Sequence, residues 1–149
     1  MPEQETIERA REDAREGKSP STQAGEFVRE EIHHVREGKH GVRSPQQAIA
    51  IGLSQARRAG VKLSAPKGSA SLRRKAAQDE RAGEAPRRKV SSKRSRATEK
   101  ALQQESRGSV SKTALARQAS RAAAKRGRSS RTRAAAKAAH TRKANRRTL

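Results

Sequence analysis

A shortage of large apolar side chains limits what this chain can fold into more than any other feature. Phe27 is the only Phe, Trp or Tyr among 149 residues, and much of the 30% hydrophobic content is alanine. A folded core has to bury enough apolar surface to offset the entropy that the chain loses on ordering. We therefore expect one small helical unit within a chain that is otherwise extended or conditionally helical.

The stretch SPQQAIAIGLSQARRAG predicts a complete amphipathic helix. Ser44 is a preferred N-cap, Pro45 fits the first helical position, and Gln47 completes a Ser-x-x-Gln capping box. Gly60 is placed for a left-handed C-terminal cap. Gly52, inside the helix, costs about 1 kcal/mol relative to alanine. A glycine there makes sense if another backbone packs closely against it.

A second helix is expected from about Thr22 to Glu37, followed by Gly38 as a stop. Both helices repeat apolar residues at the spacing of one helix face. They predict a mainly α fold whose centre is a helical hairpin over about residues 22–60. A unit this small is at the limit of independent folding, so a homo-oligomer or a protein partner through the hairpin stays open. The expected hairpin core consists of Phe27, Val28, Ile32, Val35, Ile49 and Leu53.

The positive charge is concentrated in the second half of the chain. The formal net charge is +22, of which residues 1–66 carry +1 and residues 67–149 carry +21. This break predicts a nearly neutral head followed by a basic tail. We divide the chain into a polar charged N-terminal segment, a hairpin unit, a disordered basic linker and a tail rich in Ala, Arg and Lys. Their respective ranges are 1–18, 19–63, 64–96 and 97–149. The N-terminal segment is expected to form a polar, solvated helix that stops by Gly17.

The basic tail is expected to be disordered to conditionally helical. Alanine, arginine and lysine favour helices intrinsically, and residues 111–126 and 131–144 are the best candidates. Like charges at Arg117, Arg121 and Lys125, four residues apart, oppose helix formation until they are neutralised. The sequence therefore predicts that these segments gain helix when a polyanion binds.

A tail this basic predicts binding to polyanions, with nucleic acid as the first candidate. Each Lys or Arg that neutralises a phosphate releases a counterion, which gives affinity without sequence readout. The tail has no aromatic residue on which a base can stack. We expect largely sequence-independent binding, with DNA favoured over RNA. The predicted contact residues are Arg87, Arg88, Lys89, Lys93, Arg94, Arg96, Arg117, Arg121, Lys125, Arg126, Arg128, Arg131, Arg133, Lys137, Arg142, Lys143, Arg146 and Arg147.

Catalytic and metal-binding functions are not expected. The chain has no cysteine, no glycine-rich phosphate-binding loop and no nucleophile elbow. In HHVREGKH, His33 and Glu37 have the spacing to face one ion, with His34 or His40 completing the set. We interpret these residues instead as polar groups at a helix end, where histidine and lysine also suit the helix dipole. No cofactor, small-molecule ligand or metal is predicted.

Residues 39–60, KHGVRSPQQAIAIGLSQARRAG, resemble the signature of small, highly basic bacterial proteins that form a domain family of unknown function. The signature is Lys-x-Gly, a Ser, and then Gln-Ala-Ile-Ala-Ile-Gly-Leu-Ser-x-Ala-Arg-x-Ala-Gly. The resemblance implies a bacterial origin and no defined activity. In composition, the tail resembles the basic tails of linker histones and bacterial histone-like proteins, which bind DNA.

Two alternatives to DNA binding stay open. One is a small adaptor that docks a protein through the hairpin, and the other is a basic protein associated with RNA or the ribosome. No apolar run approaches the roughly 20 residues of a membrane span. The first 18 residues also lack the apolar segment of a signal peptide. We expect no membrane partner, and a cytoplasmic location in a bacterial nucleoid.

Overall fold

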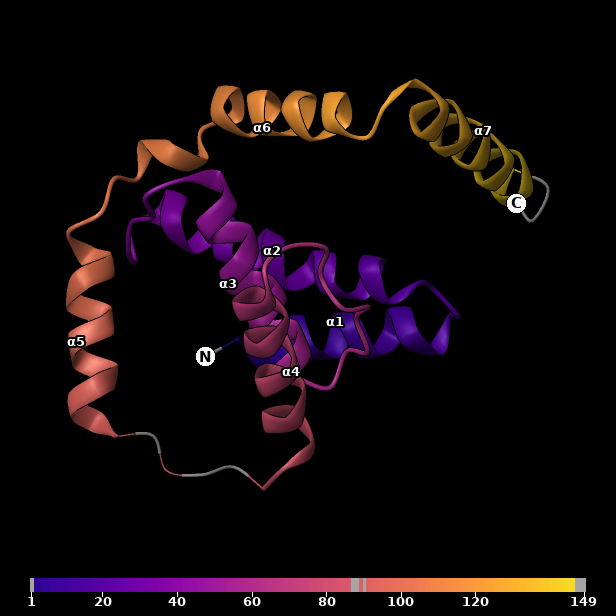
Figure 1. The fold of residues 1–149 in the computed structure, drawn as a ribbon. Helices are drawn as coiled ribbons and strands as arrows, with labels where there is room; N and C mark the ends of the chain where they lie inside the picture. The colour runs from indigo at the N-terminus through magenta and orange to yellow at the C-terminus, as the bar shows by residue number, and fades with distance from the viewer. Residues whose placement is uncertain (1, 87–88, 90, 147–149) are drawn as a thin grey trace. The chain divides into compact units, whose positions relative to one another are not determined.

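The structure is a computed structural model that describes residues 2–86, 89 and 91–146, and of Asn145 only the backbone. The described residues form helices and no strand, which confirms a mainly α fold, and the chain divides into two compact units, Met1–Ser111 and Lys112–Leu149. The first unit contains α1 (Gln4–Arg15), α2 (Pro20–Glu37), α3 (Pro45–Arg58), α4 (Ala70–Glu84), α5 (Ser92–Gln103) and the 3-10 turn η1 (Gly108–Val110). The second contains α6 (Lys112–Lys125) and α7 (Arg128–Asn145), as Figure 1 labels them.

The predicted hairpin is formed by α2 and α3, and α3 begins and ends at its sequence signals. Ser44 caps α3 by accepting a hydrogen bond from the Gln47 N–H at 3.2 Å. The Gln47 side chain accepts from the N–H of the residue before Ser44, so the capping box is shifted by one residue. At the other end Gly60 is left-handed, with φ 97°, and the Val61 N–H donates to the Ala56 carbonyl at 3.0 Å. This is a Schellman motif.

Gly52 allows α2 and α3 to approach each other closely. A Cβ at this position would lie 2.7 Å from the Cα of Val28 and 2.8 Å from its backbone nitrogen. Backbone atoms cannot move aside without displacing the whole helix, so only glycine fits at this crossing. The close backbone approach expected at Gly52 is confirmed.

The core forms two clusters along the hairpin, and both draw on residues outside it. The first cluster consists of Ala10, Ala24, Phe27, Ala56 and Val61. The second consists of Val35, Val42, Ala48 and Val110. Among the predicted core residues, Phe27 and Val35 are fully buried. The other predicted core residues are half-buried: Val28, Ile32, Ile49 and Leu53.

The polar N-terminal segment is helical and packs on the hairpin. Thr6 and Ala10 of α1 are buried, and Ile7 packs against the first cluster. The Arg9 guanidinium donates to the Glu26 carboxylate of α2 at 2.8 Å. A helix with so few apolar residues is held here by small buried side chains and an ion pair across the contact.

Helix α4 occupies part of the range for which the sequence predicts a disordered linker. It lies along α3, where Asp79 is 2% exposed and accepts hydrogen bonds from Ser54 and Arg58 at 2.8 Å each. A Cβ at Gly83 would lie 2.4 Å from the Arg57 carbonyl oxygen. The helix therefore docks through a buried carboxylate and a glycine contact. A buried carboxylate and a glycine contact leave no repeat of apolar residues in the sequence. The hydropathy pattern of this segment therefore predicts disorder.

The segment that joins α5 to α6 returns to the hairpin, which the sequence does not predict. The Gly41 N–H donates to the Leu102 carbonyl at 2.9 Å. The next N–H, of Val42, donates to the Ser106 carbonyl at 3.0 Å. Val110 is 0% exposed and lies in the second core cluster. The compact unit therefore ends at Ser111 instead of near residue 63.

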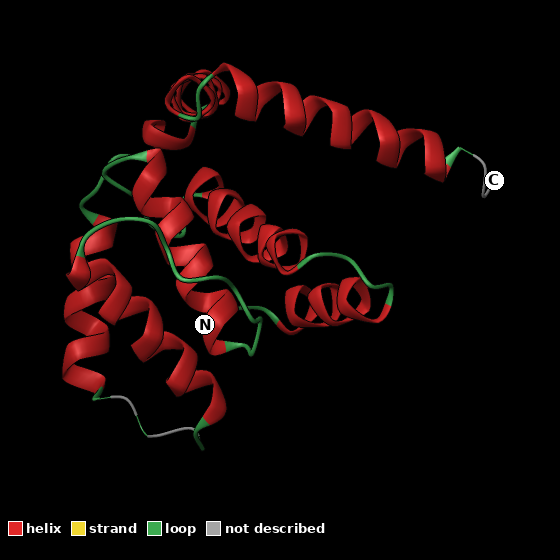
Figure 2. Ribbon diagram, turned by 45° about the vertical axis from the view of Figure 1, so that its right-hand side comes forward, coloured by secondary structure: helices red, strands yellow, loops and turns green. Residues whose placement is uncertain are grey.

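The second unit also differs from the expected disordered to conditionally helical tail. It consists of two continuous helices, separated at Gly127, whose φ is 73° (Figures 1 and 2). The physical reason is that alanine, arginine and lysine have high helix propensity along both helices. Repulsion at a spacing of four residues costs only a few tenths of a kcal/mol per pair, about 0.2–0.5.

Replacement of Gly52 by alanine tests the close helix crossing. Gly52→Ala should lower the free energy of unfolding by about 1–3 kcal/mol, because the new Cβ overlaps the backbone of α2. Gly25→Ala is the matched control, since a Cβ at Gly25 meets nothing within 4 Å. It should raise stability by up to about 1 kcal/mol through helix propensity. Urea denaturation of both variants provides the comparison, and equal effects would show that the crossing is not tight.

The Asp79 carboxylate makes a pH-dependent contribution to stability. Burial acts to raise the pKa of Asp79, but hydrogen bonds from Lys75, Ser54 and Arg58 outweigh it and lower the pKa below the ordinary 3.8. Because the folded pKa is the lower one, the contribution is complete above the unfolded value and disappears as the pH falls through the folded value. Asp79→Asn should therefore cost about 2 kcal/mol at pH 7 and much less below the folded pKa.

The control for Asp79→Asn is Glu80→Gln on the same helix. Among the described residues Glu80 pairs with Lys62, at 3.7 Å, and 41% of its side chain is exposed. An exposed ion pair of this kind contributes about 0–1 kcal/mol. Urea denaturation at pH 7 and in acid should separate the two variants. An Asp79→Asn loss that is the same at both pH values would contradict the buried-carboxylate account.

Candidate nucleic-acid interface

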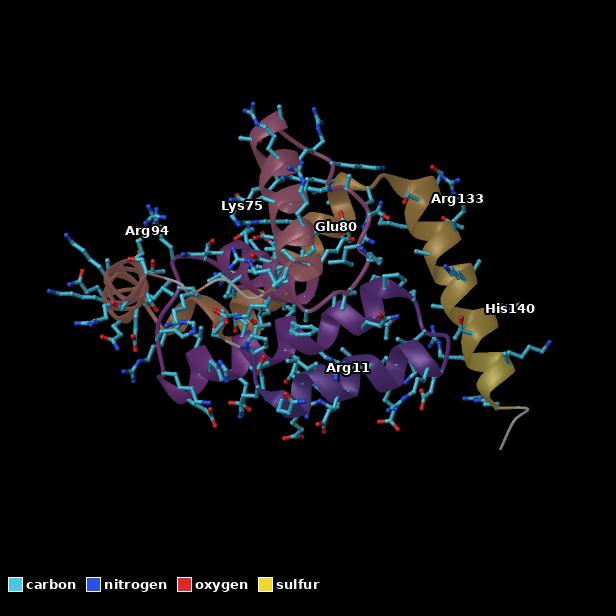
Figure 3. The ribbon with its side chains drawn as sticks, turned by 90° about the horizontal axis from the view of Figure 1, so that it is seen from below. Arg11, Lys75, Glu80, Arg94, Arg133 and His140 are labelled. Carbon is cyan, nitrogen blue, oxygen red and sulfur yellow. The ribbon has the colours of Figure 1, made fainter. Side chains whose placement is uncertain are left out.

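The unit formed by α6 and α7 has many basic side chains and no acidic side chains to balance them. Residues 112–149 contain 13 lysines and arginines and no aspartate or glutamate. Every Lys and Arg whose side chain is described in this unit is exposed. Figure 3 marks Arg133 and His140 on α7, both with side chains directed away from the helix axis. This unit therefore has no acidic side chain of its own to neutralise these cations.

A stripe of positive charge runs along α6. Arg117, Arg121 and Lys125 are four residues apart, so they lie on one face at a rise of about 6 Å each. Duplex DNA carries one negative charge about every 1.7 Å along its axis. The α6 helix presents three cations in a row about 6 Å apart.

Helix α7 spreads its charge around its circumference. At 100° per residue, Arg128, Arg131 and Arg142 fall on one side, whereas Arg133 and Lys137 fall on the opposite side. An exposed helix with cations on two sides presents positive charge in more than one direction. This arrangement favours contact with a charged surface over a single fixed docking geometry.

Basic residues also lie where helices begin. Lys93, Arg94 and Arg96 follow the start of α5, and Arg128 and Arg131 lie in the first turn of α7. Neither helix has an acidic residue in its first turn. Cations at this end oppose the helix dipole, whereas an anion is stabilised there by both the dipole and the cations. A phosphate at either helix start would relieve that conflict.

Basic residues of the compact unit are in a different situation, because acidic partners neutralise many of them. All 15 acidic residues of the chain lie in residues 1–111. Lys39 is 3.0 Å from Glu3, and hydrogen bonding to Glu3 raises the pKa of Lys39. Hydrogen bonds to Asp13 and Glu16 raise the pKa of Lys18 in the same way. Paired cations of this kind have less to gain from a phosphate than the uncompensated cations of α6 and α7.

The predicted contact residues divide between the two units. Four belong to the first unit, at or just before α5: Lys89, Lys93, Arg94 and Arg96, of which Arg94 is marked in Figure 3. Three lie outside the described residues: Arg87, Arg88 and Arg147. The others are exposed positions of the second unit: Arg117, Arg121, Lys125, Arg126, Arg128, Arg131, Arg133, Lys137, Arg142, Lys143 and Arg146.

The histidines of HHVREGKH separate into an outer and an inner group. His33 and Glu37 are 3.0 Å apart and exposed, as expected for polar groups at a helix end. His34 and His40 turn inward, and His40 Nε2 lies 3.4 Å from the buried Glu31. Burial raises the pKa of the Glu31 carboxyl, while the two inner histidines act to lower it. The inward position of His34 has one signal in the sequence, which is the pair Glu30 and Glu31 one helical turn earlier on the same helix.

Comparison with known proteins gives one match. Residues 4–67 match the model of a family described as a family of unknown function (DUF6496). The matched region covers α1, α2 and α3 and includes the signature-like stretch at 39–60, which supports an uncharacterised domain there. No curated protein and no solved structure has a significant match to the chain. Separately, no helix in the described ranges is both long and apolar enough to cross a membrane.

Proposed function

We propose that this protein binds nucleic acid, and DNA in the first place, through phosphate contacts made by the α6–α7 unit. The observation that carries the proposal is an exposed helical unit within residues 112–149, a range whose sequence contains 13 basic residues and no acidic one. No catalytic step is part of this function. The compact first unit acts as a separate head that anchors the protein, pairs with a second copy or recruits a partner.

Counterion release supplies the affinity in this proposal. Each cation that replaces a condensed counterion on DNA gains free energy that depends on salt and not on base sequence. If about eight phosphates are contacted, the slope of log K against log salt concentration is near −7. The binding is therefore tight at low salt and falls steeply as salt rises.

DNA is favoured over RNA because the charges are carried by helices. The major groove of B-form DNA admits an α-helix. The major groove of A-form RNA is deep and narrow, so the same helix reaches only its outer phosphates. Stacking on single strands needs aromatic side chains, which α6 and α7 lack. The signature at residues 39–60 resembles those of bacterial proteins, so we place this function in a nucleoid.

Removal of the α6 stripe should reduce the salt dependence of DNA binding. The full chain with Arg117→Gln, Arg121→Gln and Lys125→Gln should bind duplex DNA with a slope about 3 units shallower, since about 0.9 is lost per phosphate contact. Fluorescence anisotropy at a series of salt concentrations measures this slope. Circular dichroism of the variant confirms that helix content is retained.

The matched control removes the same charge from the first unit. Arg11→Gln, Arg15→Gln and Arg29→Gln change exposed residues of α1 and α2, and Figure 3 marks Arg11. This variant should keep the wild-type slope, because these side chains are not expected to contact phosphate. An equal loss in both variants would show that net charge alone governs binding and that α6–α7 forms no interface.

Binding should also be nearly independent of base sequence. Duplexes of the same length and unrelated sequence should differ in dissociation constant by less than about tenfold, because phosphate contacts carry no base information. Competition measurements at fixed salt test this, with an RNA duplex of equal length as the comparison. A preference above about a hundredfold for one DNA sequence indicates direct base readout and contradicts the proposal. Tighter binding to the RNA duplex contradicts the preference for DNA.

A further inference from the structure

Two buried carboxylates and two histidines meet where α2 passes into the loop before α3. The side chains of Glu30 and Glu31 are 4% and 2% exposed. Those of His34 and His40 are 14% and 17% exposed. Glu31, His34 and His40 each offer one ligand atom, and these atoms lie within 4.8 Å of one another. We propose that Glu31, His34 and His40 bind a divalent transition-metal ion, for which zinc is the best match.

Three buried side-chain oxygen atoms of α2 and α3 have no hydrogen-bond partner among the residues that the structure describes. They are Glu31 Oε1, Glu30 Oε2 and Gln55 Oε1. A buried acceptor without a donor costs free energy, and a buried carboxylate costs more than a neutral group. Gln55 belongs to α3 and its amide nitrogen is 3.4 Å from the other Glu31 oxygen, so the Gln55 side chain lies beside Glu31. A cation bound by Glu31 would satisfy the oxygen that needs a partner most.

The orientation of His40 suits it to metal coordination. Its Nδ1 lies 3.1 Å from the Gly41 carbonyl oxygen, which can only accept a hydrogen bond. Nδ1 therefore carries the hydrogen, and the neutral ring presents a lone pair at Nε2. Metal-binding histidines are held in this way, with the second ring nitrogen donating to a carbonyl or a carboxylate. The Nε2 atom is the one that faces Glu31.

The distance between these two atoms fits a tetrahedral ion. His40 Nε2 is 3.4 Å from Glu31 Oε1. Two ligands bound to zinc at about 2.0–2.2 Å with a tetrahedral angle are about 3.4 Å apart. Imidazole and carboxylate ligands are those of zinc and its neighbours in the first transition series, whereas calcium and magnesium prefer oxygen ligands alone.

A second group of possible ligands lies closer to the surface and is less suitable. It consists of Glu3, Glu30 and His34. Glu3 is 54% exposed, and its Oε1 is already 3.0 Å from both His34 and the Lys39 ammonium. A metal ion there would have to displace the lysine from its carboxylate or accept its repulsion. We therefore place the ion at Glu31 and treat the outer group as an ordinary ion-pair cluster.

The test uses the full chain after treatment with a chelator, and the probes are Zn²⁺ and Co²⁺ alone. Calorimetric titration with zinc should show one site per chain, and zinc should raise the midpoint of thermal unfolding. Co²⁺ should produce the visible absorption bands of a low-symmetry four-coordinate site. His40→Gln and Glu31→Gln should each weaken zinc binding at least tenfold.

His33→Gln is the matched control, because His33 is the exposed neighbour of His34 and pairs with Glu37. It should leave zinc affinity unchanged, whereas Glu3→Gln, which alters a group 3.0 Å from His34 Nε2, should weaken zinc binding less than His40→Gln does. Circular dichroism of the metal-free variants establishes that they fold. Glu31→Gln preserves the shape of the side chain and removes a buried charge, so the metal-free variant should be folded.

Several outcomes would overturn the proposal. Absence of saturable zinc binding to the wild-type chain would do so without reference to any variant. Wild-type affinity in both His40→Gln and Glu31→Gln would show that the ion lies elsewhere. A loss in His33→Gln as large as in His40→Gln would identify a surface histidine site, and a loss confined to Glu3→Gln would identify the outer group. None of these measurements involves nucleic acid, so the result is independent of the proposed DNA binding.

Discussion

The contact between the backbones of α2 and α3 at Gly52 is the constraint on which the compact unit depends. With one Phe and few branched apolar residues, the hairpin cannot fill a wide space between its helices. Without a side chain at Gly52, the helices approach until even Ala24, Ala48 and Ala56 are buried. Alanine side chains then fill the core positions that larger apolar side chains occupy in most proteins. This is possible because close packing depends on how well neighbouring atoms fit together.

Polar groups take over much of the stabilisation that a larger apolar core would supply. Asp79 holds α4 against α3, Glu26 holds α1 against α2, and the backbone of Gly41 and Val42 holds the segment after α5. All 15 acidic residues of the chain lie in residues 1–111, where these polar contacts are found. The side chains of the α6–α7 unit carry charge of a single sign, because residues 112–149 contain no aspartate or glutamate.

The parts of the fold that were predictable have local signals. Ser44 and Gly60 mark the ends of α3, and the spacing of Phe27, Val28, Ile32 and Val35 marks one face of α2. The docking of α4 and Val110 was not predictable in this way, because each depends on partners more than 20 residues away. The basic residues were apparent from composition alone. The inward turn of His34 and His40 was not, because it depends on Glu31 being buried by α3.

Val110 also has a mechanical consequence. It is buried in the second core cluster, its carbonyl accepts a hydrogen bond from Arg36 at 3.2 Å, and α6 begins two residues later. The end of the compact unit is therefore fixed to the hairpin at Val110. Tension applied to the chain beyond Ser111 would first act on Val110 and its bonds to the hairpin. The hairpin would bear that load before α4 or α1, neither of which lies between Val110 and its partners.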